Sequence, residues 1–244
     1  MLNPGARIQE PEGRTMCPSF VRLKFSVLKL PALLLLPLLL LLLSFGCSKT
    51  DGDFRSGFES GQYRTVVAFG DSIVAGYRQP EGWPEILSRD LAARYPGVTV
   101  INAGISGDTA ADGLARLEAD VLDHSPQMVI VAFGLNDMKN GVSIPRFEED
   151  LSTIVGEVMS SGARPVLLTT TRLQRGANIL SRMNPAPFNK SIRTLAEEKD
   201  IPLIDVNEQF KGLNTSEYLI DAAHPNGEGY RALADIIRKN LIGE

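Results

Sequence analysis

Val66–Gly76 reads VVAFGDSIVAG, and the change of pattern inside this stretch decides the fold. Val66–Phe69 is apolar throughout, as in a strand buried on both faces. Gly70-Asp71-Ser72 follows at once, and a run of small and apolar residues comes after it. The stretch therefore predicts a buried strand that ends in a tight turn, with a serine at the point where a helix begins. Ser72 is either a nucleophile held at the tip of a strand or a polar residue that starts a helix.

The sequence outside this stretch repeats the alternation of strand and helix. Apolar runs typical of buried strands occupy five segments: Thr65–Phe69, Val98–Asn102, Met128–Phe133, Pro165–Thr169 and Pro202–Asp205. Helix-like stretches lie between and after them: Trp83–Arg94, Ala110–Leu122, Pro145–Ser160, Asn184–Lys199 and Gly227–Leu241. This alternation predicts a parallel five-stranded sheet covered by helices on both faces, in one α/β domain over residues 64–244.

The first 46 residues are predicted to be a signal peptide rather than part of the fold. Arg22, Lys24 and Lys29 precede the uncharged, leucine-rich run Leu30–Phe45. This run is short for a membrane span and contains two prolines, both of which suit a signal-peptide core. Small residues precede Cys47, as expected at a cleavage site.

Cys47 would be the first residue of the exported protein. The segment before it resembles a bacterial lipoprotein lipobox, although Ser44 stands where Leu, Val or Ile is usual. The resemblance implies that Cys47 is lipidated and anchors a periplasm-facing protein in the cell envelope; ordinary cleavage would give a secreted soluble protein with a spectator thiol. The other cysteine, Cys17, would leave with the signal peptide, so no internal disulfide is expected.

Residues 47–63 are polar and contain three glycines, and we predict that they form a tether. The chain as a whole has 43% hydrophobic residues and a net charge of −4, which is ordinary for a globular protein. Lys and Arg do not cluster, so no nucleic-acid partner is expected.

Four polar segments follow predicted strands directly or after a short connection. They are Gly70-Asp71-Ser72, Asn102–Thr109, Gly134–Asp137 and Asp221–Pro225. Ligands of open parallel sheets bind beyond the carboxyl ends of the strands. The four segments are therefore predicted to meet at one edge of the sheet, and their shared position is the observation that points to a site.

A serine hydroxyl needs a base before it attacks a carbonyl carbon, and the usual base is histidine. The chain has two histidines. His124 precedes a strand and is interpreted as a solvated residue at a helix end. His224 follows the last strand, and Asp221 lies three residues earlier, where its carboxylate can orient the imidazole. The alternative for His224 is a plain helix-start residue before Pro225.

An acyl-transfer site also needs hydrogen-bond donors for the oxyanion. The backbone N–H of Ser72, the backbone N–H of Gly107 and the side-chain amide of Asn136 are the candidates. Taken singly, Gly107 is equally well explained as a turn glycine and Asn136 as a turn-forming residue before Asp137.

Gly70-Asp71-Ser72, Gly107, Asn136 and His224 resemble, in this order, the four signature blocks of the SGNH hydrolases, also called GDSL esterases and lipases. The resemblance extends from about Thr65 to Leu241. Within the family, the chain is most similar to the bacterial thioesterase I, lysophospholipase L1 and arylesterase group, especially over NAGISGDTAADGLARL, residues 102–117.

The resemblance implies a flavodoxin-like three-layer α/β/α fold and a cofactor-independent serine hydrolase. It assigns Ser72 as the nucleophile, Asp221 and His224 as acid and base, and Gly107 and Asn136 as members of the oxyanion hole with Ser72. The chain departs from the family pattern by reading GDSI for GDSL and GLND for GGND. The second change places Leu135, with Met138 close behind, as candidate residues of the substrate pocket.

Other motifs point elsewhere and are set aside. No G-x-S-x-G is present, so the nucleophile elbow of the α/β-hydrolases is absent from the sequence. GEGYRA at residues 227–232 imitates a dinucleotide fingerprint but does not follow a strand, and we interpret it as the start of a helix. Asp71, Asp108, Asp137 and Asp221 have one histidine near them in the predicted site, so no metal is expected.

The sequence therefore predicts a serine esterase that hydrolyses acyl esters or thioesters through an acyl-enzyme, without a cofactor. One alternative keeps the same residues and is a carbohydrate O-deacetylase acting on envelope or extracellular glycans. A second alternative is a non-catalytic, envelope-anchored binding module. The long segment Thr170–Pro187 is either a lid or pocket wall, or a plain surface connection.

Overall fold

Five parallel strands form the centre of the protein, and they stand in the order β2-β1-β3-β4-β5. The computed structural model describes residues 54–174 and 183–243. The strands are β1 (Thr65–Gly70), β2 (Thr99–Gly104), β3 (Met128–Ala132), β4 (Arg164–Leu168) and β5 (Leu203–Ile204). The predicted parallel sheet is confirmed, and each predicted strand lies within two residues of an observed one.

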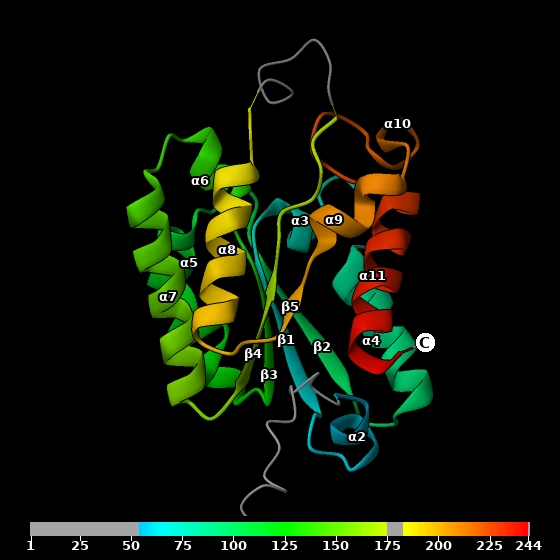
Figure 1. Ribbon diagram of the computed structural model, residues 1–244. Helices are drawn as coiled ribbons and strands as arrows, with labels where there is room; N and C mark the ends of the chain where they lie inside the picture. Colours follow the sequence, from blue (N-terminus) through cyan, green and yellow to red (C-terminus); the bar gives the residue numbers. More distant parts are fainter. Residues whose placement is uncertain (1–53, 175–182, 244) are drawn as a thin grey trace, which may run out of the picture. The chain divides into compact units, whose positions relative to one another are not determined.

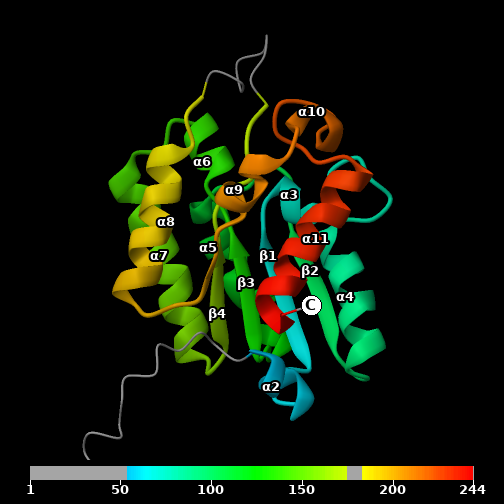
Figure 2. The same cartoon turned by 45° about the vertical axis from the view of Figure 1, so that its right-hand side comes forward.

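Helices cover both faces of the sheet (Figure 1). The longer ones are α4 (Trp83–Arg94), α5 (Ala110–Asp120), α7 (Ile144–Ser160), α8 (Ala186–Glu198) and α11 (Gly227–Ile242). The shorter ones are α2 (Phe54–Glu59), α3 (Ser72–Ala75), α6 (Leu135–Lys139), α9 (Val206–Gln209) and α10 (Thr215–Tyr218). Helices α4 and α11 pack on one face with α2, and α5, α7 and α8 pack on the other, which confirms the three-layer α/β/α fold (Figure 2).

The alternation of side chains along β1 explains why both faces need covering. Val66 and Ala68 belong to the core beneath α4 and α11, whereas Val67 and Phe69 belong to the core beneath α5 and α7. All four side chains are fully buried. Successive residues of a strand point to opposite faces, so a strand that is apolar at every position is stable only between two helical layers.

The predicted tether is wrong for its second half. Residues 54–63 are part of the domain, because Phe54 and Phe58 of α2 and Tyr63 after it are buried. The ring of Phe58 stacks on Tyr95 at the end of α4, with centroids 5.6 Å apart. Gly57, which the prediction counted as a linker glycine, lies against the ring of Tyr63, where a Cβ would meet ring atoms at 2.2 Å. Glycine is therefore needed at position 57 for close packing against Tyr63, not for chain flexibility.

The predicted signal peptide, Cys47 and the first part of the predicted tether lie outside the described residues. Within the ranges that are described, no helix is long and apolar enough to cross a membrane.

Candidate active site

The four polar segments meet at the carboxyl ends of the strands, around the point where the strand order reverses. The chain passes from β1 to β2 on one side and returns to β3 on the other, so β1 has a neighbour on each side. Loops that leave such neighbouring strands diverge and create a crevice. Ser72 follows β1 directly, the Gly107 loop follows β2 and Asn136 follows β3.

The turn that carries Ser72 is fixed by its neighbours in sequence. Asp71 is the N-cap of α3, and its side chain accepts a 2.9 Å hydrogen bond from the N–H of Ile73. Gly70 packs so closely on β3 that a Cβ would lie 2.3 Å from the carbonyl oxygen of Ala132. Ser72 therefore starts a helix, as one of the two interpretations predicted, and its hydroxyl also contacts His224.

Ser72, His224 and Asp221 form a continuous chain of hydrogen-bonding contacts. The Oγ of Ser72 lies 3.0 Å from Nε2 of His224. The other ring nitrogen, Nδ1, lies 2.8 Å from Oδ2 of Asp221 and 3.0 Å from Oδ1. The Asp221 contact holds Nδ1–H as a donor, which leaves Nε2 free to accept a proton from the serine.

Asp221 is suited to remain ionised. Partial burial acts to raise the pKa of Asp221, but hydrogen bonds from the N–H groups of His224 and Ala223 and from the His224 ring outweigh it, so the pKa lies below its usual range. Both N–H groups donate to Oδ1 at 2.9 Å. A carboxylate that accepts several such bonds keeps its charge and can accept the hydrogen bond of the His224 ring.

Tyr77 holds the imidazole from one face. Its ring stacks on the His224 ring with centroids 3.9 Å apart and planes 27° apart. The guanidinium of Arg78 lies over the Tyr77 ring, 5.0 Å from its centroid. The ring of His224 is therefore fixed both by a hydrogen bond at its edge and by an aromatic surface.

The candidate oxyanion donors converge beside Ser72. Gly107 has φ of +100°, a left-handed conformation that favours glycine, and a Cβ built there would meet nothing within 4 Å. Asn136 is buried and donates one Nδ2–H to the carbonyl oxygen of Asp108 at 3.0 Å, which orients its amide. In the described part of the chain, the N–H groups of Ser72 and Gly107 have no hydrogen-bond partner, so both remain available to a ligand.

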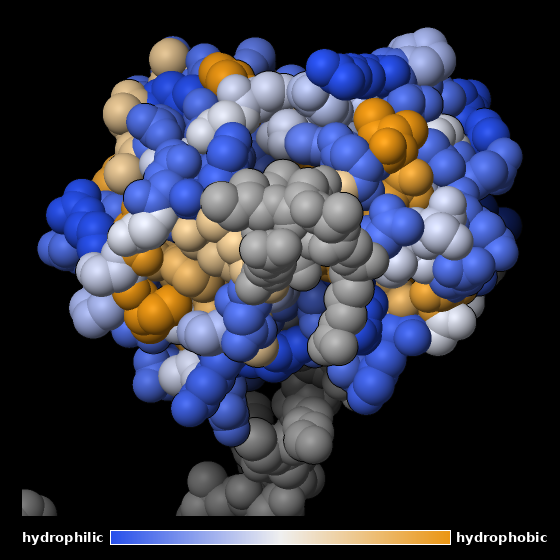
Figure 3. Space-filling view, turned by 90° about the horizontal axis from the view of Figure 1, so that it is seen from above, coloured by the Kyte–Doolittle hydropathy of each residue, from blue (hydrophilic) through white to orange (hydrophobic). Residues whose placement is uncertain are grey.

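An open groove passes over these groups. Its lining includes every predicted catalytic and oxyanion residue except Asp221, together with the predicted pocket residues Leu135 and Met138. Tyr77, Ser106, Lys139, Leu173 and Ala223 complete it. Seen from above, the surface around the strand ends is mostly hydrophilic with scattered apolar patches (Figure 3). Ile105 and Ile220, adjacent in sequence to Ser106 and Asp221, are among the most exposed large apolar side chains.

Comparison with known proteins places this geometry in a family. Residues 68–232 match the model of the GDSL-like lipase/acylhydrolase family. The chain belongs to this family. It is 33% identical to thioesterase 1/protease 1/lysophospholipase L1 of Escherichia coli strain K12 over 186 residues, covering 75% of this chain and 86% of the relative. A crystal structure of the lipase/acylhydrolase from Enterococcus faecalis, 32% identical, superposes with a TM-score of 0.65 over 74% of this chain and 96% of that chain.

Two more relatives carry other descriptions. One is the uncharacterized lipoprotein YqeF of Bacillus subtilis strain 168, 31% identical over 68% of this chain and 82% of the relative. The other is an acetylxylan esterase of Geobacillus stearothermophilus, 27% identical over 71% of this chain and 92% of the relative. Membership of the family makes the chain an ester hydrolase, so it is an enzyme and not merely a binding module.

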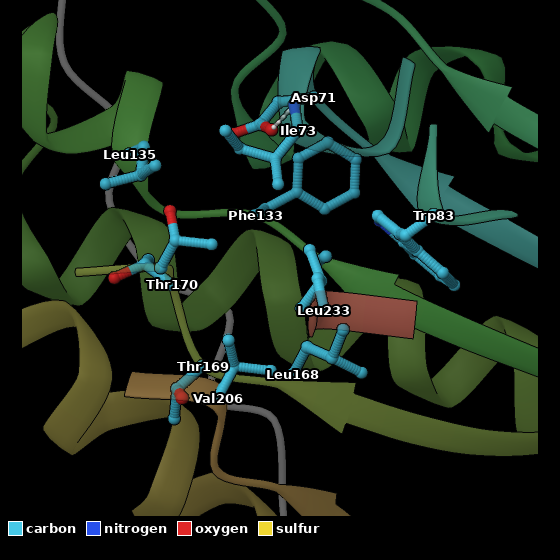
Figure 4. A pocket seen from close by; sticks show the side chains of 12 residues that line it. Asp71, Ile73, Trp83, Phe133, Leu135, Leu168, Thr169, Thr170, Val206 and Leu233 are labelled. Atoms are coloured by element: carbon cyan, nitrogen blue, oxygen red, sulfur yellow. Dashed lines mark hydrogen bonds between the residues drawn. The ribbon is translucent and has the colours of Figure 1, made fainter. Parts of the chain in front are cut away.

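A second, small cavity of this GDSL hydrolase lies beside the serine turn and is lined almost entirely by buried residues (Figure 4). Asp71 is at one end, with Leu135 and Thr170 to one side and Trp83 and Leu233 to the other. Burial raises the pKa of Asp71 to about 7, and the nearby charges of Asp137 and Asp108 add to the effect. Leu135 lines both this cavity and the open groove, so its side chain is part of the wall between them.

The sites that the sequence interpretation set aside remain apart from the groove. His124 ends a short 3₁₀ helix, Leu122–His124, is exposed and lies just before β3 begins. Gly227 starts α11, as interpreted, and Asn226 caps that helix through Gly229. Among residues 54–174 and 183–243, no three His, Cys, Asp or Glu side chains gather in a way that would hold a metal ion.

Residues that the sequence reasoning missed are those that support the catalytic groups. Tyr77 follows the quoted stretch by one residue, but stacking on a histidine 147 positions later cannot be seen in the sequence. Arg116 lies in residues 102–117, which the sequence interpretation compared with the family, but its contacts with Asp108 and with two strand ends appear only in the fold. Of the long segment after β4, Leu173 reaches the groove, and residues 175–182 lie outside the described part.

Proposed function

We propose that Ser72 is the nucleophile of this esterase, with His224 as general base and Asp221 as the group that orients and supports the imidazole. One observation carries the proposal: Oγ of Ser72, Nε2 of His224, Nδ1 of His224 and Oδ2 of Asp221 form an unbroken series of contacts of 3.0 and 2.8 Å. The three residues come from segments up to 152 positions apart, and Ser72 and His224 line the open groove.

The geometry supports a two-step reaction. Oγ of Ser72 attacks the acyl carbonyl carbon while Nε2 of His224 takes the hydroxyl proton. The carbonyl oxygen becomes an oxyanion, which the N–H groups of Ser72 and Gly107 and the amide of Asn136 stabilise. His224 then protonates the leaving alcohol or thiol as the bond to it breaks. Water attacks the acyl-serine by the same route in reverse, which releases the carboxylic acid and restores Ser72.

Acyl esters or thioesters with an aliphatic acyl group are the proposed substrates. Leu135, Met138 and Leu173 give the groove apolar walls, and Ile105 and Ile220 add exposed apolar surface near it. The thioesterase and lysophospholipase relative supports this substrate class. A second candidate is removal of acetyl groups from a glycan, which the acetylxylan esterase relative favours.

The enzyme is proposed to act outside the cytoplasm, as an exported protein that is anchored to the envelope by a lipid on Cys47. The leucine-rich run and the lipobox-like segment carry this proposal, and the lipoprotein relative supports it. Labelling cells that express the full chain with a palmitate analogue should mark wild type and leave Cys47→Ser unmarked. Equal labelling of the two proteins would contradict lipidation at Cys47.

The test of the catalytic proposal uses the domain from residue 48 onward and a short-chain aryl ester. We expect Ser72→Ala and His224→Ala each to lower kcat by about 10⁴–10⁶, because nucleophile and base act as a unit. A fluorophosphonate probe should label wild type and not Ser72→Ala. Near-normal turnover by the folded Ser72→Ala protein would refute the proposal. A panel of acyl thioesters, lysophospholipids and acetylated xylo-oligosaccharides then separates the two substrate classes by kcat/KM.

A further inference from the structure

Arg116, on the second turn of α5, makes contacts with three separate segments of the chain. Its Nε donates to Oδ2 of Asp108 at 2.7 Å, and its terminal nitrogens donate to the carbonyl oxygens of Ala103 at 2.9 Å and Gly70 at 3.0 Å. The guanidinium also lies over the ring of Phe69, 4.7 Å from its centroid. The side chain is 15% exposed, so these bonds are largely protected from solvent.

The segments held by Arg116 are those that carry the proposed oxyanion donors. Gly70 ends β1 two residues before Ser72. Asp108 follows Gly107 directly, and its carbonyl oxygen accepts the hydrogen bond from Asn136. One guanidinium therefore fixes the ends of β1 and β2 and, through Asp108, the positions of the Gly107 N–H and the Asn136 amide.

The exposed part of the loop between β2 and α5 is held by hydrogen bonds rather than by packing. Ile105, Ser106 and Gly107 are exposed, and the glycine makes no close packing contact. The N–H of Ile105 donates to the Gly70 carbonyl oxygen at 3.0 Å, and that oxygen is the same acceptor that Arg116 uses. Because packing does not hold this part of the loop, it depends on hydrogen bonds, and the planar fork of Arg116 fixes direction as well as distance.

We propose that Arg116 is a positioning residue that sets the geometry of the oxyanion hole through Asp108 and the ends of β1 and β2. The inference rests on the proposed function, since it concerns the donors assigned there. Such donors act mainly on the transition state, whose oxyanion they must meet at hydrogen-bond distance. Loss of Arg116 displaces the donors without removing any of them, so it weakens transition-state binding more than substrate binding.

The test compares Arg116→Gln, Arg116→Lys and wild type on one aryl ester. We expect Arg116→Gln to lower kcat by about 10–100-fold with KM changed by less than about threefold, since small misplacements of catalytic groups have effects of this size. Affinity for a trifluoromethyl ketone, which forms an oxyanion adduct with serine, should fall in parallel with kcat/KM. Arg116→Lys restores the charge but not the fork, and it should recover only part of the loss.

Arg238→Gln is the matched control, because Arg238 is also a half-buried arginine between two carboxylates, Asp235 and Asp90, but joins α11 to α4. It should lose stability without loss of kcat or of inhibitor affinity. Asp108→Asn removes one of the two carboxylates that pair with Arg116, the other being Asp120, and keeps both strand contacts. It therefore provides a second test if Arg116→Gln does not fold. Its effect and that of Arg116→Gln should not add in the double variant.

The proposal is overturned if folded Arg116→Gln or folded Asp108→Asn keeps wild-type kcat and inhibitor affinity. It is also overturned if the kcat of either variant falls only as far as the fraction of active sites that a fluorophosphonate titrates in that variant. If either of these results is found and Ser72→Ala is inactive, the proposed function still holds and only the role of Arg116 is refuted. An active Ser72→Ala protein refutes the proposed function, whatever Arg116 does.

Discussion

Two carboxyl groups stand at the same edge of the sheet in opposite surroundings. Asp221 lies behind His224, which lines the open groove, and it accepts hydrogen bonds from two N–H groups and from the ring of His224. Asp71 borders the second cavity, is almost fully buried and accepts a hydrogen bond from the N–H of Ile73. The pKa of Asp221 lies below its usual range, whereas burial raises the pKa of Asp71 to about 7.

The difference shows that hydrogen bonding to His224, not nearness in sequence to Ser72, distinguishes the proposed acid from the other carboxyl group. Asp71 is the immediate neighbour of Ser72, yet its side chain caps α3 and turns into the cavity. Asp221 is 149 positions away and reaches the base. A carboxylate that accepts three bonds can hold a charge beside an imidazolium, and a carboxyl in an apolar cavity cannot do so at low cost.

The largest effect is expected at Asp221. Asp221→Asn should lower kcat by about 10³–10⁴ with the fold intact, because the amide cannot stabilise the protonated imidazole and does not enforce its tautomer. Asp71→Asn is the matched variant at the second cavity, and the asparagine can still cap α3 by accepting the hydrogen bond from the N–H of Ile73. Its kcat at pH 7 should stay within about tenfold of wild type. Equal losses in the two variants, measured with a short-chain aryl ester, would show that the comparison assigns the wrong roles.

A substitution of Asn136 tests the open groove without changing the charge of any residue. Asn136→Ala removes one oxyanion donor and should lower kcat by about 10²–10³ while KM changes little. The hydroxyl of Ser72 and the His224 pair remain, so slow labelling by a fluorophosphonate should persist. A rise in KM at constant kcat would instead identify Asn136 as a residue that binds substrate and transition state equally.

Asp71→Asn should also change how stability depends on pH. The unfolded chain loses this proton near pH 4 and the folded chain near pH 7, so between these values the folded state binds more protons. The free energy of unfolding of wild type therefore falls as the pH rises through this window. Asparagine does not titrate, and across the window the variant should gain roughly 2–4 kcal/mol relative to wild type.

Urea unfolding of both proteins at several pH values between 4.5 and 8.5 measures this difference. Above pH 7 the two curves should run parallel, since Asp71 is then ionised in both states. Parallel curves over the whole range would show that Asp71 is not buried as a neutral acid.

The smallest effect is expected at Leu135, the side chain shared by the groove and the cavity. Leu135→Ala opens the wall toward apolar surface, so kcat/KM for longer acyl esters relative to acetyl esters should rise by about 3–10-fold, because each buried methylene contributes about 0.8 kcal/mol. Met138→Ala is the control, since Met138 lines the groove but not the cavity. An unchanged chain-length profile, or one shared with Met138→Ala, would count against a cavity behind Leu135 that substrates can enter.

Most of the fold was predictable because its signals are local. The apolar run at Val66–Phe69 needs cover on two sides, and the helical stretch Trp83–Arg94 was predicted with the bounds that the structure has. The failure at residues 54–63 has a physical cause: a short, polar-looking segment with Gly57 forms α2 only because its aromatic side chains dock on Tyr95 and α11. No isolated six-residue helix would be stable.

The sequence by itself determined the strand-turn-helix unit around Ser72, the parallel three-layer fold and the candidate residues at the ends of the strands. These follow from periodicity, from glycine at the turns and from the rule that parallel strands end at one edge. Only the tertiary structure decided that Tyr77 stacks on the His224 ring, that Arg116 joins two strand ends to Asp108, and that a second cavity lies behind Leu135. Hydrogen-bond direction and burial depend on contacts between distant segments, and such contacts exist only once the sheet has brought those segments together.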